Sequence, residues 1–155
     1  MIIFLDSSAW IKYFFNEEGT LKFQRFIDEY SDLNNRFVAC AITYAEMIAI
    51  VTQAFHEQRM NQQNFKATIK AFKEQWEHVD VPEVNGNLIV SSGQLAETYR
   101  LNGQDAFKLA CALDTKATLF ISCHNQLNDA AKHNGLEIWN PKEEEFFLES
   151  TRLFD

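Results

Sequence analysis

The sequence predicts an α/β fold, a three-layer α/β/α sandwich around a central, mainly parallel sheet of four to five strands. Short apolar runs alternate along the chain with longer segments whose apolar residues recur at helical spacing. Strands separated by helices require crossover connections, which are right-handed and cover both faces of a parallel sheet. The 155 residues suit one domain and contain no linker or repeat, so we expect a single domain over residues 1–155.

Five short runs rich in apolar residues predict the strands, at 2–5, 37–42, 79–81, 118–121 and 137–139. Helical periodicity predicts a first helix that begins after Ser7 or Ser8, and further helices over 19–30, 43–57, 62–76, 88–101, 105–116 and 125–134. Gly135 follows the last of these helices, in the position that a helix C-cap prefers. The start of the helix over 88–101 is the least defined, because asparagine and glycine precede it.

Composition places the chain among ordinary globular proteins, with 46% hydrophobic and 23% charged residues. Its apolar runs are far shorter than the roughly 20 residues that span a bilayer. The first residues contain no basic region and no cleavage site of a signal peptide, so we expect a cytosolic protein without a membrane segment. Cys40, Cys111 and Cys123 are odd in number and widely spaced, which favours free thiols over disulfides. Neither a CxxC nor an HxxxH spacing occurs, so we do not expect zinc.

The formal net charge of −8, with only 14 Lys and Arg residues, limits how the chain can bind nucleic acid. A protein that binds an extended stretch of phosphate backbone normally carries a basic patch or stripe. An acidic chain that handles nucleic acid must instead neutralise phosphate charge with bound cations, or use the basic surface of a partner chain.

Three acidic residues stand at informative positions in this predicted fold. Asp6 directly follows the first strand, at the carboxyl end where ligands bind in open α/β sheets. Glu46 lies about one helical turn after the second apolar run, among apolar neighbours, and Asp105 opens a helix that is otherwise mostly apolar. We therefore expect all three carboxylates to be directed toward the same rim of the sheet.

Each acid also has a purely structural explanation. Asp105 could cap its helix, and Thr43 with Glu46 matches a capping box. For each acid considered alone, a structural role is favoured over a functional one. Taken together, three carboxylates at one rim repel one another, and water or a cation must offset that repulsion.

Carboxylate oxygens suit Mg²⁺ or Mn²⁺ rather than zinc. Such an ion lowers the pKa of water and stabilises charge on phosphoryl oxygens, and a second ion roughly 4 Å away would complete a two-metal arrangement. This chemistry hydrolyses phosphodiesters without a Ser, Cys or His nucleophile.

The sequence resembles the PIN-domain ribonucleases, and among them the VapC-type toxins of toxin–antitoxin pairs. The resemblance runs from Ile2 to Pro141 through IIFLDSSAWIKYF, ITYAEM, QDAFKLACAL and LFISCHNQLNDAAKHNGLEIWNP, in family order. Each piece is short and mostly apolar, and the ordered set with its spacing carries the signal. The resemblance implies a parallel sheet flanked by helices, dependence on Mg²⁺ or Mn²⁺, and RNA as substrate. Family habit also implies a homodimer and an inhibitory antitoxin partner.

The resemblance assigns roles to individual residues. Asp6, Glu46 and Asp105 fall on the family's first three acidic positions, which implies that Asp6 and Asp105 are metal ligands and that Glu46 is a ligand or orients a water of the metal. Ser8 falls on the hydroxyl position after the first aspartate, where it would contact such a water. The alternative for Ser8 is an N-cap of the first helix.

The fourth acidic position of the family is where this sequence departs from the pattern. His124 stands there, in the segment 121–127. An imidazole can bind Mn²⁺, shuttle a proton or contact phosphate, and the alternative is a surface residue without a role. Asp129 lies about a turn and a half further along the next helix, and we do not expect it to substitute.

Three hypotheses follow for function. The first is a metal-dependent endoribonuclease of the toxin kind, with Asp6, Glu46 and Asp105 as its catalytic acids and Ser8 and His124 as secondary contributors. The second, motivated by His124, is a PIN-like module that binds RNA or protein without turnover. The third, a phosphoacceptor receiver domain, fits poorly because one acid rather than an adjacent pair follows the first strand, and no lysine directly follows the strand at 118–121.

Overall fold

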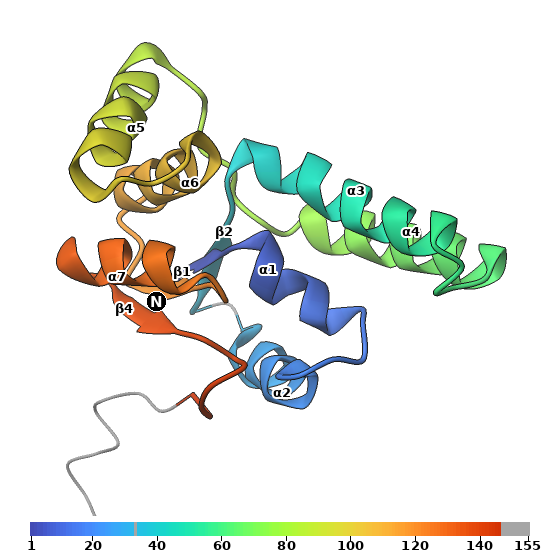
Figure 1. The fold of residues 1–155 in the computed structure, drawn as a ribbon. Coiled ribbons are helices and arrows are strands. Elements are labelled where there is room, and N and C mark those ends of the chain that lie inside the picture. The colour runs from blue at the N-terminus through green and yellow to red at the C-terminus, as the bar shows by residue number, and fades with distance from the viewer. Residues whose placement is uncertain (33, 147–155) are drawn as a thin grey trace, which may run out of the picture.

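The computed structural model describes residues 1–32 and 34–146. Within them a sheet of parallel strands forms the centre of the molecule, in the order β2-β1-β3-β4 (Figure 1). The strands are β1 (Ile2–Leu5), β2 (Arg36–Val38), β3 (Leu119–Ile121) and β4 (Glu137–Trp139). This sheet confirms the predicted α/β architecture with a parallel sheet of four to five strands.

Helices form the connections between the strands. In chain order they are α1 (Ser7–Trp10), the 3₁₀ helix η1 (Ile11–Tyr13), α2 (Thr20–Tyr30), α3 (Ala41–His56), α4 (Gln62–Trp76), α5 (Gly86–Tyr99), α6 (Gly103–Asp114) and α7 (Asn125–His133). Figure 1 shows α3 and α4 lying side by side as a pair that extends away from the sheet, while α5 packs on α6. None of the helices in the described ranges has the length and apolar composition that a membrane span requires.

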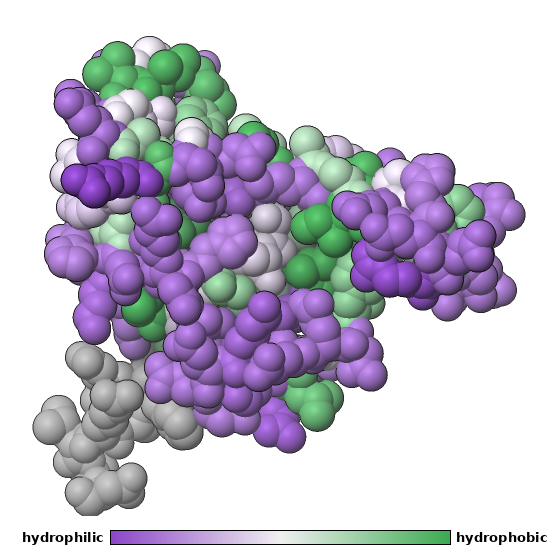
Figure 2. All heavy atoms as spheres, viewed as in Figure 1, coloured by the Kyte–Doolittle hydropathy of each residue, from purple (hydrophilic) through white to green (hydrophobic). Residues whose placement is uncertain are grey.

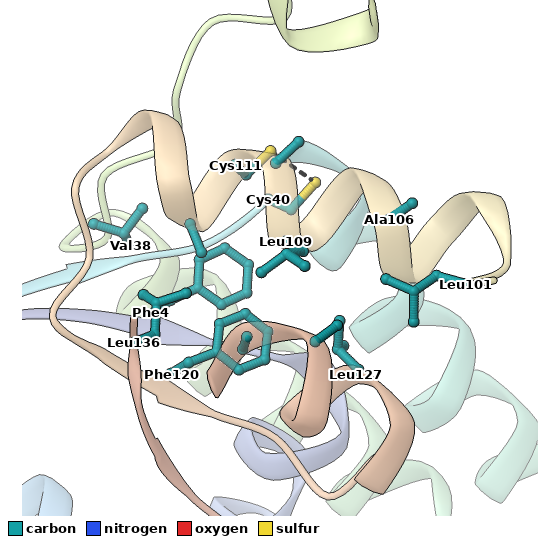
Figure 3. Packing of buried hydrophobic residues seen from close by; sticks show 14 of the residues in the cluster. Phe4, Val38, Cys40, Leu101, Ala106, Leu109, Cys111, Phe120, Leu127 and Leu136 are labelled. Carbon is teal, nitrogen blue, oxygen red and sulfur yellow. Dashed lines mark hydrogen bonds between the residues drawn. The ribbon is translucent and has the colours of Figure 1, made fainter. Parts of the chain in front are cut away.

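The strand side chains alternate between the two faces of the sheet, and each face has its own buried core. Phe4 and Phe120 point to one face and stack with their ring centroids 4.9 Å apart, beneath Leu109 of α6 and Leu127 of α7 (Figure 3). The opposite face is covered by α1, α2, α3 and α4. Its fully or almost fully buried residues include Ile3, Leu5, Leu119, Ile121, Trp10, Phe23, Met47 and Phe72. Helices on both faces confirm the three-layer sandwich.

The predicted strand at 79–81 is wrong. Asp80 makes only an isolated parallel bridge to Val38, with hydrogen bonds from Asp80 N to Phe37 O (2.9 Å) and from Ala39 N to Asp80 O (3.0 Å). Pro82 follows, and its ring nitrogen cannot donate to a ladder. The segment therefore touches the edge of the sheet at one residue without continuing as a strand.

The apolar run at 37–42 divides between two elements. Strand β2 ends at Val38, and Cys40 is already the N-cap residue of α3. A short apolar run is compatible with a buried strand and with a buried helix turn, so its periodicity did not separate the two. The consequence is that α3 begins at Ala41, earlier than predicted.

Asparagine side chains set the starts of three helices. Asn61, Asn85 and Asn102 accept hydrogen bonds from the backbone N–H three residues later, at 2.8, 3.0 and 2.8 Å. These caps place the starts of α5 and α6 ahead of the predicted ranges and define the start that the sequence left open. At the other end of the chain, Gly135 follows α7 with φ +84°, which confirms the predicted glycine cap.

All three cysteines are free, as predicted. Cys40 and Cys111 lie buried against each other, with their Sγ atoms 3.3 Å apart (Figure 3). Cys123 is partly buried and directly precedes His124.

Candidate active site

Asp6 is the buried centre of a polar cluster at the carboxyl end of the sheet. It follows β1, and its backbone N–H donates to the carbonyl of Ile121 (3.0 Å), which fixes it beside the end of β3. Its carboxylate has no exposed surface. Atom Oδ2 accepts hydrogen bonds from the hydroxyl of Ser122, at 2.8 Å, and from that of Ser8. These donors hold the carboxylate in one orientation.

A buried lysine joins Asp6 to Glu46. The Lys108 Nζ atom lies 2.7 Å from Asp6 Oδ1 and 2.9 Å from Glu46 Oε1, and the lysine side chain is 2% exposed. The other oxygen of Glu46, Oε2, accepts a hydrogen bond from the Ser7 hydroxyl at 2.8 Å. Glu46 therefore points into the cluster, and the capping-box interpretation is wrong because Thr43 lies inside α3 rather than at its N-cap.

Asp105 approaches the same cluster from α6. Its Oδ1 atom lies 3.5 Å from Nδ1 of His124, which in turn lies 4.0 Å from Asp6 Oδ2. Asn102 donates to Asp105 Oδ2 at 3.0 Å and is itself the N-cap residue. The cap interpretation of Asp105 is therefore wrong, and its carboxylate is directed toward His124.

Ser8 and His124 tie the loop after β3 to Asp6. Ser8 is the second residue of α1, so its N-cap interpretation is wrong, and Asp6 occupies the N-cap position. The Ser8 hydroxyl accepts a hydrogen bond from the backbone N–H of Cys123 (2.9 Å) and donates to Asp6. His124 is the N-cap residue of α7 and keeps 48% of its side chain exposed, at the open side of the cluster.

The structure thus brings Asp6, Asp105 and His124 together, and it connects Glu46 to them through Lys108. Across residues 1–32 and 34–146, no three His, Cys, Asp or Glu side chains converge closely enough to ligate one metal ion. The ammonium group of Lys108 lies between Asp6 and Glu46, so these two carboxylates share a lysine instead.

The ionisation of the buried pair follows from opposing effects. Burial by itself raises the pKa of Asp6, but the Lys108 ammonium and the hydroxyls of Ser8 and Ser122 hold that pKa below its usual value. Burial likewise lowers the pKa of Lys108, but the charges of Asp6 and Glu46 raise it above its usual value. Both groups are charged at neutral pH.

His124 is influenced by the same acids. The contact with Asp105 raises the pKa of the imidazole, burial opposes this, and the charge of Asp6 adds to the rise. The histidine therefore binds a proton more readily than a free imidazole does, and about half of its side chain is exposed to solvent.

The donor set fits a hard divalent cation. Asp6 Oδ1 lies against the Lys108 ammonium, whereas Asp6 Oδ2 and Asp105 Oδ1 are both directed toward the half-exposed His124, where a cation can approach them. Mg²⁺ is commonly bound by one or two carboxylates while it keeps several waters. Asp6 and Asp105, which reach the same imidazole, can supply two such carboxylates.

The comparison with protein families gives a match over most of the chain. The PIN domain family model matches residues 3–133. The chain belongs to the PIN domain family. This confirms the resemblance on which the residue roles were predicted. No curated protein sequence matches this PIN domain significantly.

Solved structures with the same fold come from several bacteria. VapBC-1 from nontypeable Haemophilus influenzae is 24% identical with a TM-score of 0.63, and the match covers 92% of this chain and 100% of that one. FitAcB from Neisseria gonorrhoeae is 14% identical with a TM-score of 0.64 (93% and 100% covered). A toxin–antitoxin complex from Klebsiella pneumoniae is 16% identical with a TM-score of 0.64 (93% and 100% covered). At these identities the likeness establishes the fold.

Lys108 is the residue of this site that sequence reasoning missed. The signal was present, because Lys108 lies one helical turn after Asp105 on the same face of a predicted helix. Its neighbours Leu109 and Ala110 are apolar, and a lysine in such a run is buried only when a charge partner accompanies it. Ser122 was missed as well, and its position directly after a predicted strand, like that of Asp6, was the available signal.

Proposed function

We propose that this PIN domain is a metal-dependent endoribonuclease that hydrolyses RNA phosphodiester bonds, as the toxin of a toxin–antitoxin pair. The observation that carries the proposal is the approach of Asp6 and Asp105, from two different elements, to the same histidine at the carboxyl end of the sheet. Membership of the PIN family supports a nuclease, and the donor chemistry supports Mg²⁺ or Mn²⁺.

The residues divide the work as follows. Asp6 and Asp105 hold the metal ion, and Glu46 is a further ligand or orients the attacking water. The ion, when bound, makes water a better nucleophile and neutralises charge on the phosphoryl oxygens. The hydroxyls of Ser8 and Ser122 fix the Asp6 carboxylate, and His124 contacts a phosphate of the RNA.

Partner binding completes the proposal. Because the net charge is −8, RNA is held through the cation or through basic surface from a partner chain, and His124 adds a phosphate contact. The toxin–antitoxin complex from Klebsiella pneumoniae supports an antitoxin partner, and this partner inhibits the site by covering it. Exposed apolar side chains gather over α5 (Figure 2), where Ile89 and Val90 are 55% and 61% exposed, and such a patch supports a protein interface such as that of a homodimer.

We further propose that residues 1–155 form one domain and that the protein acts in the cytosol, where its RNA substrate is found. The described part of this domain ends at residue 146, so the last residues of the predicted boundary lie outside it.

The function is tested by incubating the purified protein with an RNA pool, with Mn²⁺ or after chelation, beside Asp6→Asn and Asp105→Asn. We expect the wild type to cleave RNA only with the ion and each variant to lose about 100-fold or more of the rate, since each removes a carboxylate that holds the ion, which neutralises charge in the transition state. Lys66→Gln, which changes an exposed lysine of α4, is the control variant, purified and assayed in the same way, and we expect it to keep the wild-type rate. Cleavage that persists in both aspartate variants would come from a contaminating nuclease.

The second candidate is a PIN module that binds RNA or protein without turnover. His124 in place of a fourth acid motivates it, and the ammonium of Lys108 among the acids also favours it. The same assay decides, because this candidate leaves the RNA pool intact at saturating Mn²⁺, and retention of that RNA on a filter separates an RNA-binding module from a protein-binding one.

A further inference from the structure

Lys108 has no part in the function proposed above, although it lies at the centre of the site. Its Nζ atom is 2.7 Å from Asp6 and 2.9 Å from Glu46, and its side chain is 2% exposed. A lysine is almost never buried without a charge partner, and both partners here are acids of the site. The ammonium therefore occupies the kind of position that a metal cation takes between two carboxylates.

The two oxygens of Asp6 face different neighbours. Oδ1 faces Lys108, whereas Oδ2 accepts hydrogen bonds from the hydroxyls of Ser8 and Ser122 and lies 4.0 Å from His124. One side of the carboxylate is thus neutralised by a group of the chain itself. The other side is directed toward the half-exposed imidazole and Asp105.

Glu46 and Asp105 differ in the same way. Glu46 uses Oε1 for Lys108 and Oε2 for the hydroxyl of Ser7, so both of its oxygens have partners within the protein. Asp105 uses Oδ2 for Asn102, and within residues 1–32 and 34–146 its Oδ1 has His124, at 3.5 Å, as its side-chain partner. A divalent ion on Glu46 would meet the lysine charge at close range, and like charges at that separation repel strongly.

We propose, on the basis of the function proposed above, that Lys108 is a built-in cation that takes the place of one of the two divalent ions that such a site can hold. A single Mg²⁺ or Mn²⁺ then binds to Asp6 and Asp105, and Glu46 is the partner of Lys108 rather than a metal ligand. Lys108 is a positioning residue, because it acts on the ion and the substrate through Asp6.

The test counts bound Mn²⁺ per chain by electron paramagnetic resonance of the free ion, and follows thermal unfolding with and without Mn²⁺. The variant is Lys108→Met, which keeps much of the apolar stem and removes the charge. Lys12→Met is the matched control, since Lys12 is fully buried but pairs with Glu17 and the carbonyl of Glu18 rather than with an acid of the site.

We expect about one ion per chain in the wild type and in Lys12→Met, and about two in Lys108→Met, where Asp6 and Glu46 face each other without a cation. Both lysine variants melt at a lower temperature than the wild type in chelator. Added Mn²⁺ raises the melting temperature of Lys108→Met more than that of the wild type, and that of Lys12→Met by the same amount as the wild type.

A second variant, Glu46→Gln, decides the matter even if Lys108→Met does not fold. Because Glu46 is not a ligand of the ion, we expect Glu46→Gln to bind about one Mn²⁺ with a Kd within about threefold of the wild type. The double variant Lys108→Met with Glu46→Gln loses the second ion and returns to about one.

Two ions per wild-type chain would overturn the proposal, as would a Lys108→Met that folds and still binds one, or a Glu46→Gln that loses Mn²⁺. RNA cleavage measured on the same samples separates this outcome from failure of the proposed function. If the wild type cleaves RNA and binds two ions, the proposed role of Lys108 is refuted and the proposed nuclease function stands. A wild type that binds one ion, gains a second in Lys108→Met and cleaves no RNA refutes the nuclease and supports the lysine.

Discussion

Two lysines of this PIN domain are almost completely buried. Lys108 of α6 lies in the acidic cluster, and Lys12 of η1 lies against the loop that contains Glu17 and Glu18. Each ammonium lies 2.7 Å from a carboxylate oxygen, of Asp6 and of Glu17 respectively. Lys12 takes a backbone carbonyl, that of Glu18 at 2.8 Å, as its other partner, whereas Lys108 takes a second carboxylate. Burial and pair distance are therefore alike, and only the partners differ.

The difference teaches that a buried lysine indicates a functional site through what surrounds it. Glu17 is 43% exposed and can regain water if its lysine is lost. Asp6 is fully buried and Glu46 is 18% exposed, so both can regain less water than Glu17 if their lysine is lost. We infer that Lys12 stabilises the loop that contains Glu17 and Glu18, while Lys108 neutralises Asp6 and Glu46 so that they can be buried together.

The largest expected effect separates the two lysines by stability. In chelator, Lys108→Met should lower the free energy of unfolding by about 3 to 5 kcal/mol, because it leaves buried charges without a partner. Lys12→Met should lower it by about 1 to 3 kcal/mol, because the remaining glutamate is partly solvated. Urea unfolding followed by circular dichroism measures both, and equal losses would show that the partners do not matter.

The next largest effect on stability is expected at Gly19, which directly follows Glu18 in the loop that Lys12 contacts. Gly19 has φ +87°, and a Cβ atom added to it would lie 2.6 Å from the carbonyl oxygen of Pro141. Gly19→Ala should therefore lower the free energy of unfolding by about 1 to 3 kcal/mol, from backbone strain and displacement of the Pro141 segment. Its Mn²⁺ binding should equal that of the wild type, because the loop lies outside the acidic cluster.

Gly93, within α5, is the matched control, since nothing lies within 4 Å of a Cβ added there. Gly93→Ala should raise the free energy of unfolding by about 0.5 to 1 kcal/mol, as alanine replaces glycine inside a helix. A Gly19→Ala variant as stable as the wild type would show that the loop is not held as described.

The smallest effect is the pH dependence that His124 contributes. The pKa of this imidazole is raised above 6.5 mainly by the Asp105 carboxylate. Protonation therefore adds stability that is fully present below pH 6.5 and is lost as the pH rises through the raised value. In chelator, the stability difference between the wild type and His124→Gln should be largest at acidic pH and disappear in alkaline buffer. A difference that does not vary with pH would show that the imidazole does not interact with these acids.

Much of the fold was predictable from the sequence because local signals agree with tertiary packing. Strand 2–5 and helix 62–76 were predicted with their observed bounds. The strand is a continuous apolar run that ends at Asp6, and the helix keeps its apolar residues at helical spacing over its whole length. The bridge at Asp80 was predicted as a strand because Val79 and Val81 flank it. A run this short does not reveal whether enough of a neighbouring strand is within reach to form a ladder. The starts of α5 and α6 were predicted two residues late, because each helix begins with a glycine directly after its asparagine cap, before the apolar periodicity.

The candidate site was predictable in its acids and not in its lysine. Asp6 is identified by its place directly after a strand, and Asp105 by its place in the first turn of an apolar helix. The spacing of Lys108 from Asp105 showed that the two share a helix face, but the pairing of Lys108 with Glu46 depends on the packing of α3 against the sheet. The partners of a charged side chain are a tertiary property, and they decide what that side chain does.

The proposed metal-dependent nuclease is tested most directly by the rate of RNA cleavage by the chelated wild-type protein as Mn²⁺ is added back. We expect no cleavage in chelator, a rate that rises with the occupancy of about one ion per chain, and loss of that rate in Asp6→Asn. Cleavage that is independent of added metal, or an RNA pool that stays intact at saturating Mn²⁺, would contradict this proposal.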